Sequence, residues 1–321
     1  RPGENHLIDK PDQWAYWRDP VPTITPPWPG KLLAWEQPHP QSMKQREVFF
    51  DPEMTAPQPA GMNFHLYRRI INRRNFTPGT FSSDITIVNW PMNDYFGGPV
   101  FEVPEDQIKR HLYQAKQLSL SLLYWLQTEA PRPDGGRGWK GLRLRGDIAG
   151  NAPDGLAKYP YIRESRRIQA EFTVLEQHVG TEARSILTGR KPDEVTAETF
   201  RDSVGIGSYR IDLHMSTGGD NYIDVSSLPF QIPLGALIPK RVRNLIPACK
   251  NIGTTHITNG CYRLHPVEWN IGEAAGALAS HALQTGETPH TIRNVATMLA
   301  DFQAKLQQQG IELNWPRLTP R

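Results

Sequence analysis

Residues 244–284 constrain the fold more than any other part of the sequence. They read as a short apolar strand, a polar loop that contains glycine, and a helix rich in small residues that can begin at Pro266. Gly272 and Gly276 lie inside this helix, where each glycine costs about 1 kcal/mol relative to alanine. Two such glycines indicate that something large lies against the helix backbone, either a ligand or a closely packed sheet.

Composition limits the class of protein and its partners. The chain has 321 residues, a net charge of +3 and 21% charged residues, with no basic block that would indicate nucleic-acid binding. No run of 18 apolar residues is present, so we expect a soluble protein with no membrane partner, either cytoplasmic or periplasmic. Cys249 and Cys261 are too few for a disulfide framework, although one bridge between them stays open.

The first 60 residues combine many prolines with aromatic side chains such as Trp14, Tyr16, Trp17, Trp28 and Trp35. Proline removes backbone donors, so this arm is expected to be extended and to wrap on the rest of the domain. Its rings have two interpretations. They anchor the arm, or they form an exposed platform for sugar rings.

Periodicity predicts the main elements. A helix is expected from Pro104 to the residue before Pro131, and another over residues 295–309. Strands are expected at residues 64–67, 84–90, 168–174 and 204–213, with a turn or strand at 230–237.

The glycine-rich loop at residues 131–158 contains the letters of the dinucleotide fingerprint, G-x-G-x-x-G, at Gly136, Gly138 and Gly141. The fingerprint needs a buried strand before it and a helix after it, and neither is predicted here. We therefore do not interpret it as a nucleotide site. No other strand–glycine turn–helix unit appears in the sequence.

Four segments, taken together, resemble a known family. They are residues 89–95 (NWPMNDY), 161–168 (YIRESRRI), 202–214 (DSVGIGSYRIDLH) and the segment 244–284 with its Gly-Glu-Ala-Ala-Gly sequence. This set is similar to bacterial FAD-dependent oxidoreductases with a glutathione-reductase-type flavin fold. The resemblance implies FAD as cofactor and identifies the last segment as the return segment of the flavin domain. In that family the glycine-rich unit opens the chain, so we expect an upstream domain or a partner chain to complete the flavin site, or a relative that lost that half.

The resemblance and the residue chemistry together suggest site residues. Histidine titrates near neutrality, so His214 and His256 are candidates for acid–base chemistry. Arg163, Arg167 and Arg263 are candidates for orienting a polar substrate, with structural ion pairs as the alternative. The resemblance places the following residues at the cofactor: Lys250, Asn251, Ile252, Gly272, Glu273, Ala274 and Ala275. The N–H groups at the start of a helix near Gly272 would then face the flavin.

Other classes stay open. A glycoside hydrolase or carbohydrate-binding protein would use two carboxylates from Asp94, Glu164, Asp212 and Glu268. A metal hydrolase would use Asp212 and His214 with His256 or His265, but no compact ligand motif supports a metal site. A purely structural module is the remaining interpretation.

We therefore expect an α+β or α/β fold. Residues 1–228 would form a substrate domain with a mixed sheet, packed helices and the aromatic, proline-rich arm, and residues 229–321 the C-terminal part of a flavin-binding domain. The expected activity is FAD-dependent oxidation or reduction of a small polar substrate, with a sugar-like compound as one candidate.

Overall fold

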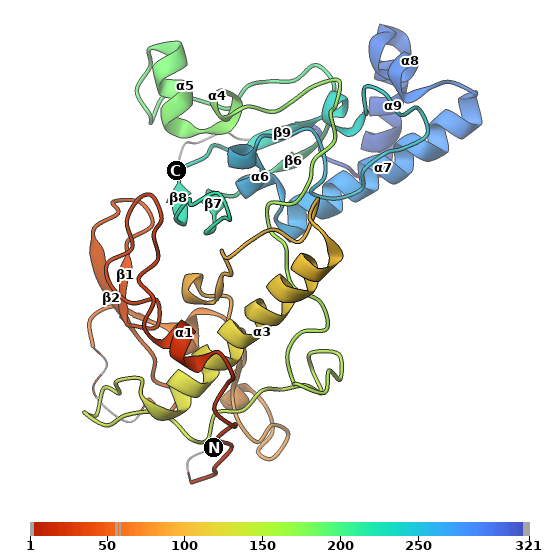
Figure 1. Cartoon of the computed structure of the whole chain (residues 1–321). Coiled ribbons are helices and arrows are strands. Elements are labelled where there is room, and N and C mark those ends of the chain that lie inside the picture. Colours follow the sequence, from red (N-terminus) through yellow and green to blue (C-terminus); the bar gives the residue numbers. More distant parts are fainter. Residues whose placement is uncertain (1–2, 55–56, 58, 317–321) are drawn as a thin grey trace. The chain divides into compact units, whose positions relative to one another are not determined.

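The structure, a computed structural model, describes residues 3–54, 57 and 59–316, and its fold is α+β (Figure 1). Strands pair in small sheets, and most of the pairings are antiparallel. The chain forms two compact units. Unit 1 holds residues 1–161 and 214–222, and unit 2 holds residues 162–213 and 223–321. The boundaries therefore differ from a division at residue 228, and the assignment of a substrate domain and a flavin domain to 1–228 and 229–321 stays a prediction.

Unit 1 contains one long helix and many short elements. Its elements are α1 (Trp14–Arg18), β1 (Glu36–Pro38), β2 (Gln45–Phe49), β3 (Met62–Asn63), α2 (Phe64–Tyr67), β4 (Arg69–Ile71), β5 (Ile85–Thr86), α3 (Glu105–Thr128) and two 3₁₀ turns, Arg73–Asn75 and Pro91–Asn93. Strand β1 pairs antiparallel with β2, which pairs parallel with β3.

Helix α3 confirms the helix predicted after Pro104. Pro104 is its N-cap residue, and Glu105 and Asp106 occupy its first turn, where acidic side chains favour the positive end of the helix dipole. Its buried face includes Leu118, Leu122 and Leu126, which recur at helical spacing.

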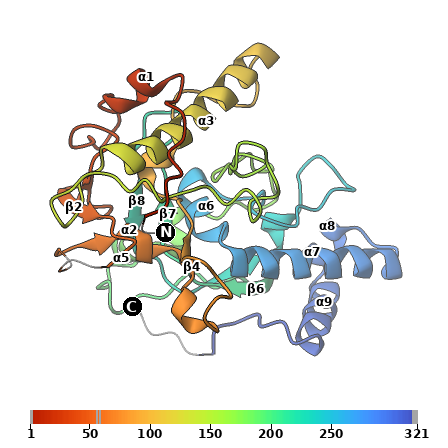
Figure 2. The same ribbon diagram turned by 90° about the horizontal axis from the view of Figure 1, so that it is seen from below.

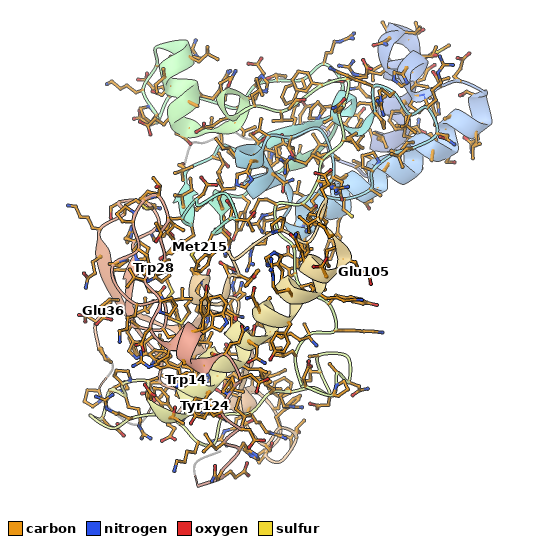
Figure 3. The ribbon with its side chains drawn as sticks, viewed as in Figure 1. Trp14, Trp28, Glu36, Glu105, Tyr124 and Met215 are labelled. Carbon is orange, nitrogen blue, oxygen red and sulfur yellow. The ribbon has the colours of Figure 1, made fainter. Side chains whose placement is uncertain are left out.

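Tryptophan rings make the core of unit 1. Seven of the nine tryptophans are buried there: Trp14, Trp17, Trp28, Trp35, Trp90, Trp125 and Trp139. Figure 3 labels Trp14 and Tyr124, whose rings meet edge to face at 4.9 Å. The rings of the N-terminal arm are therefore anchors, as one of the two interpretations expected, and only Tyr16 among those five aromatics is exposed.

Unit 2 combines short strands with a helical C-terminal part, in which α7 is the longest helix (Figure 2). Its elements are α4 (Glu176–Val179), α5 (Thr181–Thr188), β6 (Ser203–Gly207), β7 (Ile211–Leu213), β8 (Ile223–Val225), β9 (Phe230–Pro233), α6 (His256–Tyr262), α7 (His265–Thr285), α8 (Pro289–Asn294), α9 (Ala296–Gln308) and the 3₁₀ turn Leu234–Leu237. Strand β6 pairs antiparallel with β9, and β7 with β8. Helix α9 confirms the predicted last helix.

Several predicted strands were wrong in type or length. Residues 64–67 form helix α2, because the Asn63 side chain accepts the His65 N–H and caps a helical turn. The strand at 84–90 shortens to β5. The strand at 204–213 divides into β6 and β7, since the two halves pair with different partners.

The segment at residues 168–174 is extended and keeps its predicted alternation of buried and exposed side chains. It is tied to two neighbours by separate hydrogen bonds, from the Glu171 N–H to the Ile238 carbonyl (2.8 Å) and from the Val174 N–H to the Gly253 carbonyl (2.8 Å). It forms only isolated bridges, at Ala170 and Val174, and no continuous ladder.

The strand expected at the start of the return segment is absent. Residues 244–251 are irregular, and at Lys250 side chains satisfy the backbone where a strand partner would. The Lys250 N–H donates to Glu268 Oε1 (3.0 Å), and Asn259 Nδ2 donates to the Lys250 carbonyl (2.9 Å).

Candidate functional site

A buried histidine–carboxylate pair lies in unit 1. His214 Nδ1 is 2.6 Å from Asp94 Oδ2, and the two side chains are only 12% and 7% exposed. Asp94 follows the 3₁₀ turn Pro91–Asn93, and His214 follows the end of β7, 120 residues later in the chain. With the carboxylate at Nδ1, the ring carries its proton there and is held in one orientation. The fold thus joins two residues that the sequence suggested separately.

Polar side chains that sequence reasoning missed belong to the same unit. Tyr222 is buried, and its burial raises the pKa of its hydroxyl, while the Arg46 guanidinium, which hydrogen-bonds it, opposes that shift. Arg46 stands opposite Gln37 in the register of β1 and β2, so their side chains share one face. The amide nitrogen and oxygen of Gln37 are both buried without a hydrogen-bond partner among the described residues. No sequence signal singles out these three residues, because their relation depends on strand register.

Arg263 is held in unit 2 by a buried ion pair. Its Nε donates to Glu164 Oε1 (2.9 Å) and its Nη2 donates to the Asp212 carbonyl (2.6 Å), with both charged side chains less than a tenth exposed. This arrangement favours the alternative of a structural ion pair for Arg263. Arg167 is half-buried, which lowers the pKa of its guanidinium, and its Nη1 donates to the Ser165 carbonyl (2.8 Å). Arg163 is partly buried in the same segment.

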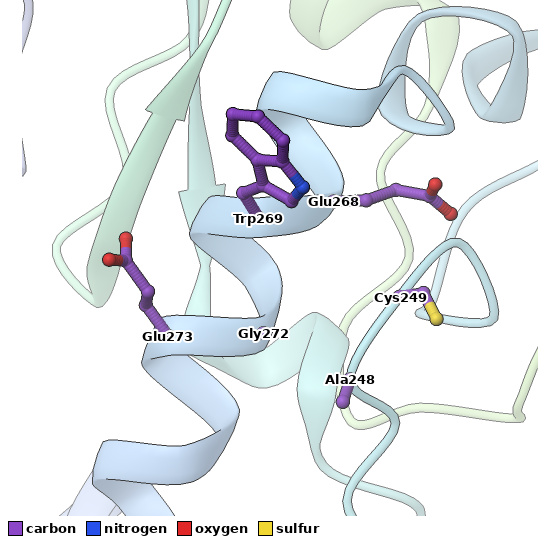
Figure 4. Close-up of a pocket in the computed structure, with 6 residues that line it drawn as sticks. All are labelled: Ala248, Cys249, Glu268, Trp269, Gly272 and Glu273. Carbon is purple, nitrogen blue, oxygen red and sulfur yellow. The ribbon is translucent and has the colours of Figure 1, made fainter.

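An open hollow of about 530 Å³ lies beside α7 in unit 2 (Figure 4). It is lined by Ala248, Cys249, Glu268, Trp269, Gly272 and Glu273. Glu268 extends from α7 toward the Cys249 loop, whereas Glu273 points away from that loop. The structure thus brings Gly272 and Glu273, two of the expected cofactor residues, to one hollow.

The other expected cofactor residues do not line this hollow. Ile252, Ala274 and Ala275 are buried in the hydrophobic core. Asn251 turns its amide to Ser165 Oγ (3.2 Å). Lys250 is half-buried, which lowers the pKa of its ammonium group, and its Nζ donates to the Ile162 carbonyl. His256 is the first residue of α6 and is partly buried. Contact of these five cofactor candidates, and of the acid–base candidate His256, with a ligand stays a prediction.

The helix that carries Gly272 does not begin near Gly272. Helix α7 begins at His265, with Pro266 in its first turn, so Gly272 lies two turns inside it. N–H groups inside an α-helix bond to carbonyls one turn earlier, and only the first four are left unpaired. The expectation that unpaired helix-start N–H groups at Gly272 face a ligand was therefore wrong.

The hollow fits the flat part of a flavin and not its diphosphate. A Cβ built on Gly272 would meet only the Ala248 carbonyl oxygen, at 3.3 Å, and one on Gly276 would meet nothing within 4 Å. This face of α7 is therefore open enough for a planar ring. Among the described residues that line the hollow, the charged side chains are the carboxylates Glu268 and Glu273, which would repel a diphosphate.

The structure gives no support to the other site chemistries. No group of three His, Cys, Asp or Glu side chains suited to a metal ion is present in the part of the chain that the structure describes. Both cysteines are free thiols, Cys261 buried and Cys249 exposed. Within residues 3–54, 57 and 59–316, no helix is both long and apolar enough to cross a membrane.

Comparison with known proteins identifies the family. Residues 28–306, most of the chain, match the family described as FAD dependent oxidoreductase. The chain belongs to the FAD-dependent oxidoreductase family, so it is an oxidoreductase whose cofactor is FAD. No curated protein and no solved structure matches it.

Proposed function

We propose that the protein oxidises or reduces a small polar substrate with FAD, and that His214, oriented by Asp94, moves the substrate proton. The buried 2.6 Å contact between His214 Nδ1 and Asp94 Oδ2 carries this proposal. Bound FAD supplies the redox chemistry, which amino-acid side chains cannot provide. The family match favours this reading over a glycoside hydrolase, because that family is defined by oxidoreductases.

Asp94 has two effects on His214. It holds the imidazole in one orientation, and it stabilises the imidazolium that forms when the ring accepts a proton. Arg46 adds a cation in the same unit, which suits a substrate rich in oxygen atoms, while the Tyr222 hydroxyl is already bonded to Arg46 and the Pro38 carbonyl. The substrate class is accordingly a small polar compound, with a sugar-like molecule as one member.

We further infer that Gly272 and the open face of α7 form one wall for the flavin ring, as the return segment of a glutathione-reductase-type flavin domain would. The described residues contain no strand–glycine turn–helix unit, and the hollow is acidic. The diphosphate is therefore assigned to a nucleotide-binding unit that the described residues do not include, on an upstream segment or a partner chain.

The proposal is tested by the rate of flavin reduction. Small polar compounds are screened for anaerobic bleaching of the FAD absorption band in the FAD-loaded protein, and the best one is used with His214→Asn and Asp94→Asn. General acid–base catalysis contributes about 10²–10⁴-fold, so the His214 variant should be at least 100-fold slower when measured at a temperature at which each variant is fully folded.

His39→Asn is the matched control, since His39 lies in the loop between β1 and β2 of the same unit. Its reduction rate should equal that of the wild type. Full activity of both His214→Asn and Asp94→Asn would refute the assignment of the proton-transfer role.

A further inference from the structure

A second hollow, of about 240 Å³, lies in unit 1 between α1, α3 and the loop after Asp94. It is lined by Tyr16, Trp17, Tyr95, Gly97, Arg110, His111 and Gln114. Neither the proposed proton transfer nor the flavin wall uses any of these residues.

A fixed hydrogen-bond network forms one side of the hollow. The Tyr95 hydroxyl donates to Gln114 Oε1 (2.7 Å) and lies 2.7 Å from His111 Nδ1. Because the hydroxyl has already given its single proton to Gln114, the proton of the second contact belongs to the imidazole. Burial raises the pKa of Tyr95 to about 12, so the phenol stays neutral. Gln114 thereby presents its NH₂ group as a donor.

The loop beside this network is built to lie close to it. A Cβ on Gly97 would lie 2.5 Å from the Tyr95 hydroxyl oxygen, and a Cβ on Gly98 would lie 2.1 Å from His111 Cε1. Only residues without a Cβ fit so near to these rings. The hollow is therefore a defined feature of the fold.

Trp17 and Arg110 line another part of the hollow. The Trp17 side chain is 1% exposed, and its indole Nε1 is buried with no hydrogen-bond partner among the described residues. Arg110 adds a cation, and no carboxylate is present among the described residues that line the hollow.

We propose that this hollow binds the carboxylate of a small aromatic acid. The Arg110 guanidinium and the Gln114 NH₂ are both donors, so together they match a group that only accepts hydrogen bonds. The ring of Tyr16, which is 61% exposed at the hollow, offers an aromatic surface for the rest of the ligand. The small volume limits the ligand to about one ring.

The test uses benzoate as probe and benzamide as its neutral counterpart, titrated into the intact protein by calorimetry. Benzoate should bind saturably and at least tenfold more tightly than benzamide. In parallel, the indole N–H resonance of Trp17, assigned through Trp17→Phe, should shift on addition of benzoate, because the Trp17 ring lines the hollow that benzoate enters.

Arg110→Gln should weaken benzoate binding at least tenfold. Lys109→Gln is the matched control, since Lys109 is the neighbouring cation on α3, pairs with Glu105 at 2.6 Å and does not line the hollow. It should change the affinity less than twofold. Absence of saturable benzoate binding, equal weakening by both substitutions, or an unmoved Trp17 resonance would each overturn the proposal. FAD does not enter this test, so its outcome is independent of the proposed oxidoreductase site.

Discussion

The two units have cores of different kinds. Unit 1 is built from short elements and loops around seven tryptophans, whereas the core of unit 2 contains no tryptophan and consists mainly of aliphatic and small side chains. Tryptophan suits a loop-rich unit, because one ring covers a large apolar area and its N–H can bond to a loop carbonyl. Trp28 and Trp35 do this with the carbonyls of Lys31 (3.2 Å) and Pro131 (2.9 Å).

In unit 2 the core is packed through the close approach of backbone segments. Ala274 and Ala275 of α7 and Gly253 before α6 let backbones pack near one another, with Phe230 stacked on Tyr262 at 4.3 Å. The stability of unit 1 therefore depends on large rings, and that of unit 2 on small side chains where backbones approach closely. Substitutions should therefore affect the two units through opposite changes in volume.

The largest effect is expected from removing a ring in unit 1. Trp125 is 2% exposed and its ring centroid lies 4.7 Å from that of Trp35. Trp125→Ala should lower the free energy of unfolding by about 3–5 kcal/mol, through lost burial and a cavity. Trp269→Ala, at an exposed tryptophan of unit 2, should change it by less than about 0.5 kcal/mol. Urea unfolding measures the free energy of unfolding of both variants, and equal losses would contradict the proposed difference between the two cores.

The second largest loss of stability is expected from removing the partner of a buried charge. Glu164→Gln leaves the Arg263 guanidinium buried without its main carboxylate, which should cost about 3 kcal/mol. Glu105→Gln breaks the exposed pair with Lys109 in unit 1 and should cost less than about 1 kcal/mol. If Glu164→Gln keeps the wild-type melting temperature but loses turnover, Arg263 acts on the substrate, as the sequence first suggested.

An added methyl group should have opposite effects on stability at two glycines of unit 2. A Cβ on Gly253 would lie 2.3 Å from the Phe172 carbonyl oxygen and 2.6 Å from the Ala170 Cβ, so Gly253→Ala should cost about 1–3 kcal/mol by overpacking. Gly276→Ala meets nothing and should instead stabilise by up to about 1 kcal/mol through helix propensity. Thermal melts measure the stability of both variants. A destabilising Gly276→Ala would show that the α7 face is already packed.

The smallest effect is a pH dependence shared by both units. Burial lowers the pKa of His65 in unit 1 and of His178 in unit 2. Below about pH 6.5 the unfolded chain binds protons at these histidines before the folded chain does. The free energy of unfolding should therefore fall as pH falls from 7.5 to 5.5. His65→Gln and His178→Gln should each reduce this slope in urea titrations, and an unchanged slope in both would contradict the assignment.

The parts of the fold that depend on local pattern could be predicted from the sequence. Helix α3 follows from leucine spacing and acidic residues at its start, and the alternation at 168–174 follows from side-chain period. The parts that depend on pairing with distant segments could not be predicted from the sequence. Strand β6 separates from β7 because they pair with β9 and β8, and in the irregular segment 244–251 the backbone of Lys250 bonds to the side chains of Glu268 and Asn259.

The candidate site shows the same division. His214 and Asp94 were each visible as residue types that carry chemistry, but only the fold joins them across 120 residues. Gln37, Arg46 and Tyr222 carry no sequence signal. The role of Arg263 toward a substrate stays a prediction, and its buried pairing with Glu164 required three-dimensional contacts.

The central claim is that the Gly272 face of α7 receives the ring of the flavin. Riboflavin, which has the ring without the diphosphate, is titrated into the protein by fluorescence quenching, with ADP as competitor. Gly272→Val should weaken riboflavin binding at least tenfold at a nearly unchanged melting temperature, because the added bulk enters an open hollow. Ala279→Val, at an exposed position of the same helix, should leave the affinity unchanged, and ADP should not compete. A Gly272→Val protein that binds riboflavin as tightly as the wild type would contradict the claim.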